Sequence, residues 1–347
     1  MNDMVALPVK RKHYGFALLR TIMCFVVVLC HFWHIPTRFA FVNYLEILKP
    51  MAVPVFMMMS FFLVSKSFGT HNPGTAKKRL VRLVWPQIAW AVIYWLFYFP
   101  IGKASVRDLL WQILTGHSES INPTMWFQTD MILLTALFFL VFHAFSRKKA
   151  LLSLGILSFI SFAAQYAGIN YALFSNLRYE LKYPLGRLTE VLPYAVAGIC
   201  FADFHIDRFL QKKPVLTALV SCAVLAGSLI AERVFPYSAP GFGYSGVFLF
   251  VEAVAVFSVA AVLPIYNIHK SAVGILNVLT NYSLGIYCSH RLVAWFIFET
   301  SIGSVLNSVF GITLGSFSGC IVIYLGCYIL CTVLSLFRIV PIKRLVN

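Results

Sequence analysis

The sequence predicts an all-α integral membrane protein, a bundle of about ten transmembrane helices with both termini in the cytoplasm. Three observations support this. Of the 347 residues 60% are hydrophobic and only 12% are charged, whereas about 25% of the residues in a soluble domain are charged. The apolar residues form stretches of about 20, the length that a helix needs to cross a bilayer. Basic residues cluster in the short segments between these stretches, as they do in membrane proteins.

The apolar stretches divide the chain into about ten candidate spans. Together they predict a single membrane domain over residues 1–347 without a separate soluble domain. The first stretch follows the basic residues Lys10, Arg11 and Lys12. It is a full span long and lacks a small-residue cleavage site, which favours a retained helix over a signal peptide. The expected spans cover residues 14–34, 45–66, 82–100, 124–145, 150–168, 186–204, 214–234, 245–265, 275–298 and 312–338.

The basic residues indicate the orientation of these spans. The formal net charge is +16, from 28 Lys and Arg against 12 Asp and Glu. With a cytoplasmic N-terminus, about twice as many basic residues fall on the cytoplasmic side as on the outer side, in agreement with the positive-inside rule. This distribution argues against nucleic-acid binding, which the net charge alone would suggest. The longer loops, 101–123 and 169–185, then lie outside, where we expect them to shape a binding site.

The first span carries two side chains that are costly in a membrane, Arg20 and His31. Eleven positions at about 100° each return to within about 20° of the same face, with a rise of about 16 Å. An imidazole can take a proton from a hydroxyl near neutral pH, and a guanidinium binds phosphates or carboxylates. The spacing alone also fits a simpler interpretation. In it, Arg20 reaches the headgroups and His31 is a structural histidine.

A basic cluster, residues 77–82, precedes the third span. Arg79 and Arg82 are three positions apart, so they are neighbours on a helix and form a candidate clamp for a phosphate group. The same cluster also fits a topology signal that contacts anionic lipids.

Other polar residues lie within expected spans. His290 is the second candidate for a cavity wall. Glu252 is a lone carboxylate that could orient a histidine, pair with an arginine or bind a proton during transport. Trp126 begins the fourth span and fits either an interfacial aromatic or a cavity residue. We find no phosphate-binding P-loop, HExxH, CxxC or GxSxG motif, and the eight cysteines lack metal-ligand spacing, so no metal site is expected.

Four segments carry short motifs in a fixed order. They are an Arg-x10-His arrangement at Arg20 and His31, the segment Val53–Val64, an Arg-x-x-Arg-x-x-x-Pro arrangement at Arg79–Pro86, and a Ser-x-x-x-Tyr-x-x-His arrangement at Ser283–His290. Together with Trp126-Phe127 they resemble the membrane acyltransferase-3 family, the bacterial ten-helix O-acyltransferases. One departure is Phe61, which follows Ser60 where the family usually has glycine. A ring there would narrow helix packing and bears on the size of the acyl group or acceptor.

The resemblance implies an acyltransferase of the bacterial inner membrane. Such proteins take an acyl group, commonly acetyl, from cytoplasmic acyl-CoA and place it on a hydroxyl of a surface polysaccharide or a lipid-linked glycan. Acyl-CoA is a donor substrate, and no permanently bound cofactor is implied. Acyl-CoA, the glycan and membrane lipids are therefore the expected partners.

The resemblance also implies roles for the candidate residues. Arg79 and Arg82 would hold the nucleotide phosphates of the donor. Arg20 would guide the pantetheine arm or polarise the thioester, and His31 would act as general base or briefly carry the acyl group. His290 would support the histidine. Two further candidate substrate-binding residues are Trp126 and Glu252.

A secondary transporter or exporter of a glycan or its precursor is the alternative function. The number of spans and the carboxylates of Glu252 and Asp130 favour it, because such groups can couple transport to protons. The two halves of the chain show no visible repeat, which weighs against it.

Overall fold

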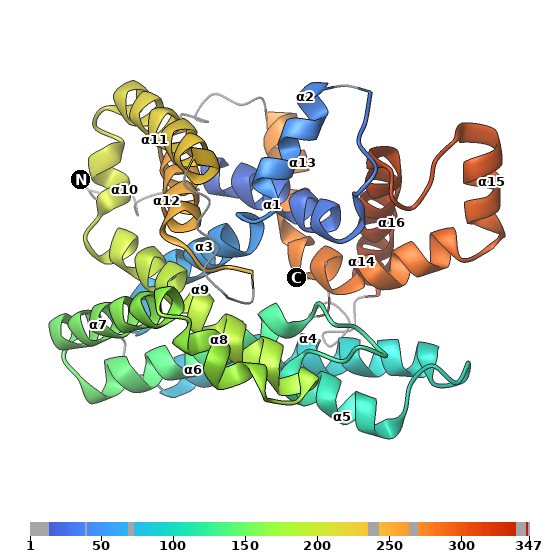
Figure 1. Cartoon of the computed structure of the whole chain (residues 1–347), viewed down its shortest axis with the longest axis horizontal. Helices are drawn as coiled ribbons and strands as arrows, with labels where there is room; N and C mark the ends of the chain where they lie inside the picture. Colours follow the sequence, from blue (N-terminus) through green and yellow to red (C-terminus); the bar gives the residue numbers. More distant parts are fainter. Residues whose placement is uncertain are drawn as a thin grey trace, which may run out of the picture.

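The computed structural model describes residues 14–38, 40–68, 73–234, 243–263, 270–337 and 345. This part of the chain contains no β-strand, and an isolated bridge between Ser118 and Asn122 is its single β-type pairing. The remaining secondary structure is helical (Figure 1), so the all-α class is confirmed. The first helices are α1 (Tyr14–Phe32), α2 (Ala40–Asn43), the 3₁₀ helix η1 (Tyr44–Leu48), α3 (Ala52–Phe68), α4 (Pro73–Tyr98), α5 (Val106–Thr115), α6 (Trp126–Ala144) and α7 (Arg147–Tyr166).

The second half of the chain continues the same architecture. Its helices are α8 (Ile169–Ser175), α9 (Tyr179–Asp203), α10 (Ile206–Leu210), α11 (Pro214–Val234), α12 (Val247–Val262), α13 (Lys270–Asn281), α14 (Ser283–Phe298), α15 (Ser301–Phe310) and α16 (Phe317–Leu336). In the view of Figure 1, α4 to α8 form a lower group, α1 and α10 to α13 lie above it, and α15 stands apart at the right edge.

Seven described helices are long and apolar enough to cross a membrane, namely α1, α4, α6, α7, α9, α11 and α16. The pair α14 and α15, bent by 73°, adds an eighth if it counts as one span, and α3 and α12 are shorter apolar helices. Each expected span overlaps one of these helices. The structure therefore supports a multi-pass membrane protein, while ten crossings and cytoplasmic termini stay predictions.

Several boundaries differ from those expected. Helix α3 begins at Ala52 rather than at residue 45, and α9 begins at Tyr179 rather than at residue 186. Two further differences concern residues of the candidate site. Helix α4 begins at Pro73 rather than near residue 82, so the basic cluster is part of the helix. The ninth expected span, 275–298, is divided at Tyr282 into α13 and α14. The start of α4 at Pro73 fits the preference for proline in the first turn of a helix, a signal that the hydropathy pattern does not contain. Neither glycine nor proline stands at the break at Tyr282.

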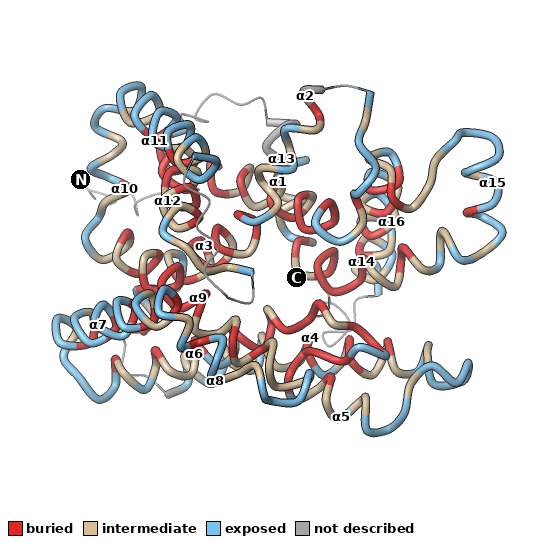
Figure 2. The backbone as a smooth tube through the Cα atoms, in the orientation of Figure 1, coloured by how far each residue is buried: buried red, intermediate tan, exposed pale blue. Residues whose placement is uncertain are grey.

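The centre of the molecule is built by close helix contacts. Helix α3 packs along α9, and Gly198 makes this possible because a Cβ at that position would collide with the backbone carbonyl of Met58. Small residues permit such close backbone approach in membrane helices. Figure 2 shows buried residues in this central region and exposed residues along α7 and α11. Those outer faces are apolar, with exposed residues such as Phe159 and Leu219, as contact with lipid requires.

Candidate active site

A cavity of about 550 Å³ lies between five helices. Its wall combines apolar side chains with a few polar groups, as is typical of ligand sites. Ser60, Gln128 and Tyr287 contribute polar atoms from α3, α6 and α14. The remaining lining residues are Arg20, Val27, Val53, Phe56, Met59, Leu63, Val64, Ser67, Thr75, Lys78, Arg79, Arg82, Leu83, Phe127, Met131, Ser283 and Leu284.

Four cationic side chains line this cavity, Arg20 from α1 and Lys78, Arg79 and Arg82 from α4. In the part of the chain that the structure describes, none of them forms an ion pair with a carboxylate. The Nε atom of Arg79 is buried and has no hydrogen-bond partner. Since unpaired cations in a membrane protein mark ligand pathways, the cavity is suited to an anionic ligand.

Aromatic side chains form part of the cavity wall. The ring of Phe127 lies 5.4 Å from that of Tyr287 and 6.2 Å from that of Phe56. The hydroxyl of Tyr287 donates to the carbonyl oxygen of Thr124. Val27 lines the cavity, and His31 does not. His31 lies four residues further along α1, a rise of about 6 Å, so the cavity ends one helical turn short of it.

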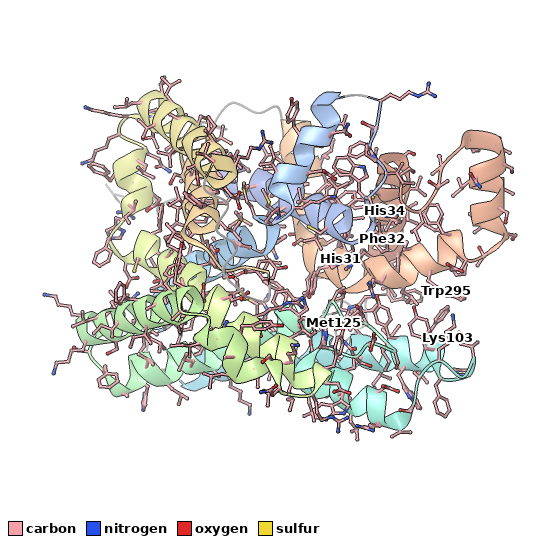
Figure 3. All side chains as sticks on the ribbon, in the orientation of Figure 1. His31, Phe32, His34, Lys103, Met125 and Trp295 are labelled. Atoms are coloured by element: carbon pink, nitrogen blue, oxygen red, sulfur yellow. The ribbon has the colours of Figure 1, made fainter. Side chains whose placement is uncertain are left out.

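His31 faces His290 across two helices. Their rings stack with centroids 5.0 Å apart and an interplanar angle of 19°. His31 is exposed, whereas His290 is fully buried. In Figure 3, His31 lies near the middle of the molecule, at the end of α1. The two histidines that the sequence singled out are therefore brought together.

The tautomer of His290 follows from its contacts. Its Nδ1 lies 2.6 Å from the carbonyl oxygen of Tyr287, and its Nε2 is buried without a hydrogen-bond partner. Because a carbonyl oxygen only accepts, Nδ1 carries the proton and Nε2 keeps a lone pair. The stack thus presents an imidazole with a fixed orientation behind the exposed ring of His31.

Helices α1 and α14 run parallel here. The thiol of Cys24 lies 3.6 Å from the carbonyl oxygen of Ser283, and seven residues later in each helix His31 meets His290. Equal spacing on two parallel helices keeps the two contacts in register. This arrangement places the histidine pair on the side of the cavity away from Arg20.

Trp126 does not line the cavity and lies against Tyr244 and Arg187. The guanidinium of Arg187 sits 4.5 Å from the centre of the Trp126 ring and 5.0 Å from that of Tyr183. Arg187 and Arg291 both lie close enough to His31 to interact with it electrostatically. The structure therefore places Trp126 in a region of aromatic and cationic side chains with Tyr183 and Arg187, and Arg187 in turn interacts electrostatically with His31.

Glu252 lies in a different place from the other candidates. It lines a second cavity of about 480 Å³, together with Glu46, Glu232 and Arg233. Its side chain is buried, and Oε1 has no hydrogen-bond partner. None of the residues that line this second cavity lines the first one, so the structure does not group Glu252 with Arg20.

His117, in the loop between α5 and α6, packs against two tyrosine rings of α9. Its ring lies 4.7 Å from that of Tyr179 and 5.4 Å from that of Tyr183, and its Nδ1 lies 2.7 Å from the carbonyl oxygen of Pro123. Burial disfavours the charged imidazolium and lowers the pKa of His117 to about 4. His117 is thus neutral at pH 7.

Phe61 does not narrow the cavity. It is buried and packs against Phe138 with ring centroids 4.8 Å apart, and it also stacks on Phe68. The residue before it, Ser60, lines the cavity instead. The expected restriction of acyl or acceptor size by Phe61 is therefore absent.

Sequence reasoning missed Arg187 and Arg291 as neighbours of His31, and it gave Tyr287 no role beyond its motif. The signal for Arg291 was present, because it lies inside an apolar stretch, where a charge needs a partner or a function. Arg187 lies at the start of an expected span, where arginines are common. Within the described residues, no group of three or more His, Cys, Asp or Glu side chains has a metal-binding arrangement.

Comparison with known proteins agrees with the site. A family model described as an acyltransferase domain, that of the acyltransferase-3 family, matches residues 13–332. No curated protein and no solved structure matches the chain significantly. The family match spans the helices that carry the cationic cavity and the histidine pair. The chain belongs to the acyltransferase-3 family and is an enzyme that transfers acyl groups.

Proposed function

We propose that the protein transfers an acyl group, acetyl in the simplest case, from cytoplasmic acyl-CoA to a hydroxyl of a surface glycan in the bacterial inner membrane. The observation that carries this proposal is the cavity lined by four cations, which ends one helical turn from the pair His31 and His290. One end suits the phosphates of a nucleotide, and the other suits the deprotonation of an alcohol.

The donor end is formed by α4 and α1. Arg79, Arg82 and Lys78 bind the nucleotide phosphates of acyl-CoA through charge-assisted hydrogen bonds. Because α4 carries them in the basic cluster, the positive-inside rule assigns them to the cytoplasmic side. The pantetheine arm then extends along the apolar wall past Arg20. A thioester is uncharged, and a mostly apolar wall accommodates its small acyl group.

The acceptor end lies at His31. An imidazole nitrogen of His31 takes the proton of the acceptor hydroxyl as its oxygen attacks the thioester carbonyl. The new C–O bond forms, the C–S bond breaks, and the leaving thiolate takes the proton from His31 to become CoA thiol. His290 supports the ring of His31 at a stacked distance of 5.0 Å and is itself held by the carbonyl of Tyr287.

An aromatic barrier separates donor and acceptor until the thioester arrives. Phe127 and Tyr287 lie at the inner end of the cavity, and movement of these rings opens the last helical turn to His31. Such a barrier prevents water from reaching the thioester and hydrolysing it, a recognised function of active-site closure.

The test compares membranes that contain the wild type with membranes that contain His31→Ala. Radiolabelled acetyl-CoA is added, and label in the envelope glycan is measured. We expect His31→Ala to lower transfer by about 100-fold or more, the usual contribution of a general base. His34→Ala is the matched control, because His34 is exposed three residues further on and its Nδ1 contacts the carbonyl of Phe32. Equal labelling by wild type and His31→Ala would refute the mechanism.

The transporter alternative makes a different prediction. It assigns the coupling of transport to protons to Glu252, which lines a cavity separate from the cationic cavity. Under the acyl-transfer mechanism, Glu252→Gln keeps more of the label transfer than His31→Ala does. Transport would be favoured if Glu252→Gln lost more activity than His31→Ala and if the wild type consumed no acyl-CoA.

A further inference from the structure

Arg291 is a half-buried cation without a carboxylate partner among the described residues. It follows His290 directly on α14, and its Nε is buried with no hydrogen-bond partner. None of the ion pairs between described residues includes it. An arginine inside a membrane protein is costly, so it faces a partner or a substrate pathway. The described part of the chain supplies no such acidic partner for Arg291, which indicates a ligand.

The groups around Arg291 are tyrosines. Tyr94, Tyr98 and Tyr179 lie close enough to interact with its guanidinium. The hydroxyl of Tyr94 is already used, since it donates to the carbonyl of Cys288 at 2.9 Å and accepts from the backbone N–H of Leu292 at 3.1 Å. No hydrogen bond between described residues uses the hydroxyl of Tyr98 or Tyr179. A phenol can donate a hydrogen bond to an anion, so two donors lie within electrostatic range of the guanidinium.

The second arginine near His31 differs from Arg291. Arg187 stacks on Trp126 and Tyr183, and it interacts electrostatically with the buried carboxyl group of Asp130. Its guanidinium is thus engaged by aromatic rings of the protein. Two acids, Glu119 and Glu299, interact electrostatically with Tyr179 and Tyr98. A third acid, Glu180, follows Tyr179 in the chain and pairs with Arg178.

These acids leave Arg291 unpaired. Neither Glu119 nor Glu299 forms an ion pair with it among the described residues. Arg291 also interacts electrostatically with His31. An anion bound at Arg291 therefore lies within electrostatic range of His31, the residue that we assign to deprotonate the acceptor.

We propose that the acceptor carries an anionic oxyacid group, a carboxylate or a phosphate, that is bound by Arg291 with the hydroxyls of Tyr98 and Tyr179. A planar guanidinium forms paired hydrogen bonds with either group. The acceptor alcohol then faces His31 while the anion fixes its orientation. This inference rests on the proposed acyl transfer to a glycan, and it narrows the acceptor class to acidic saccharides or saccharides linked to a lipid phosphate.

The first test identifies the chemistry of the labelled product. Membranes that contain the full chain are incubated with radiolabelled acetyl-CoA, and the smallest labelled saccharide is analysed by mass spectrometry. A labelled unit with a carboxylate assigns the anion to the sugar, and label recovered with a polyprenyl phosphate assigns it to the lipid. A labelled saccharide that lacks both groups overturns this inference while leaving acyl transfer intact. Absence of label from every glycan overturns the proposed function itself.

The second test uses variants in the same membranes. Arg291→Gln is expected to raise the KM for the acceptor by about tenfold, the loss of one charge-assisted hydrogen bond, with the KM for acetyl-CoA unchanged. Arg291→Lys, which keeps the charge, is expected to restore part of the affinity. The control is Arg178→Gln, because Arg178 pairs with Glu180 at 3.6 Å and stacks over Trp111.

Two outcomes of the variant test contradict the inference. One is an unchanged acceptor KM in Arg291→Gln. The other is an equal rise in the KM values for acceptor and acetyl-CoA, which a general disturbance of the fold would cause. The amount of each variant in the membrane is measured alongside, so that the rates are compared per molecule of protein.

Discussion

Charged groups decide where this molecule binds its ligands. Placing a charge within a membrane costs a few kcal/mol, yet Arg20 lies inside the first span. It lines one cavity with Lys78, Arg79 and Arg82 of the basic cluster, and none of the four has a carboxylate partner among the described residues. The cost is offset when an anionic ligand supplies the missing charge. Residues of this cavity should therefore affect the affinity for the donor rather than the stability of the fold.

Arg79 is the residue for testing that expectation. Arg79→Gln removes a cation whose Nε is buried without a partner, and we expect the KM for acetyl-CoA to rise by about tenfold. Lys77→Gln is the matched control, because Lys77 is exposed on the same helix and does not line the cavity. Steady-state label transfer at a series of acetyl-CoA concentrations measures both. Similar KM values for the two variants would contradict the assignment of Arg79 to the phosphates.

His117 predicts a dependence of stability on pH. Its pKa is about 4 in the folded protein and about 6.5 when unfolded, so below pH 6.5 the unfolded chain binds a proton that the folded protein does not. Stability therefore falls as pH falls from about 6.5 to 4, by up to about 3 kcal/mol. Thermal unfolding of the purified protein at pH 7 and pH 5 tests this. A variant His117→Gln should lose less stability on acidification, and an equal loss would contradict the argument.

At the scale of helices, the site depends on α1 and α14 being parallel and in register. The contacts Cys24 to Ser283 and His31 to His290 fix that register at two points. Helix α3, which supplies a wall of the cavity, is held against α9 in turn. The position of this cavity wall therefore depends on the close approach of the α3 backbone at Met58 to Gly198 of α9.

Gly198 tests the contact between α3 and α9. Any side chain there meets the carbonyl of Met58, and overpacking of this kind costs about 1–3 kcal/mol or more. We expect Gly198→Leu to lower the melting temperature of the purified protein and to reduce acyl transfer. Gly227→Leu on α11 is the control, since a Cβ at Gly227 has open space around it. Equal melting temperatures for the two variants would show that the contact is unimportant.

For the whole molecule, sidedness determines whether donor and acceptor meet. The charge distribution predicts that the loop with Lys103 lies outside and that the start of α7, which carries Lys148, lies in the cytoplasm. Lys103→Cys and Lys148→Cys, each made after replacing the exposed Cys30 and Cys222 by serine, are treated with a membrane-impermeant maleimide on intact cells. Only Lys103→Cys should react before the membrane is permeabilised. Reaction of Lys148→Cys on intact cells would contradict the predicted topology.

The sequence predicted the helical class and the region of each span, because apolar runs of sufficient length have few alternatives. Spacing also placed Arg20 and His31 on related faces of α1, and His290 was identified as a cavity candidate. The break at Tyr282, the grouping of Arg187 and Arg291 with His31, and the separate cavity of Glu252 were not predicted. These depend on which helices pack together, and one sequence does not encode that in any local pattern.

The central claim is that an acyl group crosses from a cytoplasmic donor to an acceptor on the far side of the membrane. Sealed inside-out vesicles, with the cytoplasmic face exposed to the medium, test it most directly. Radiolabelled acetyl-CoA is added outside, and the label on glycan is measured with an impermeant esterase present, before and after the vesicles are opened with detergent. We expect the labelled ester to be protected until the vesicles are opened and to be absent with His31→Ala. Label that the esterase removes from sealed vesicles would contradict transfer across the membrane.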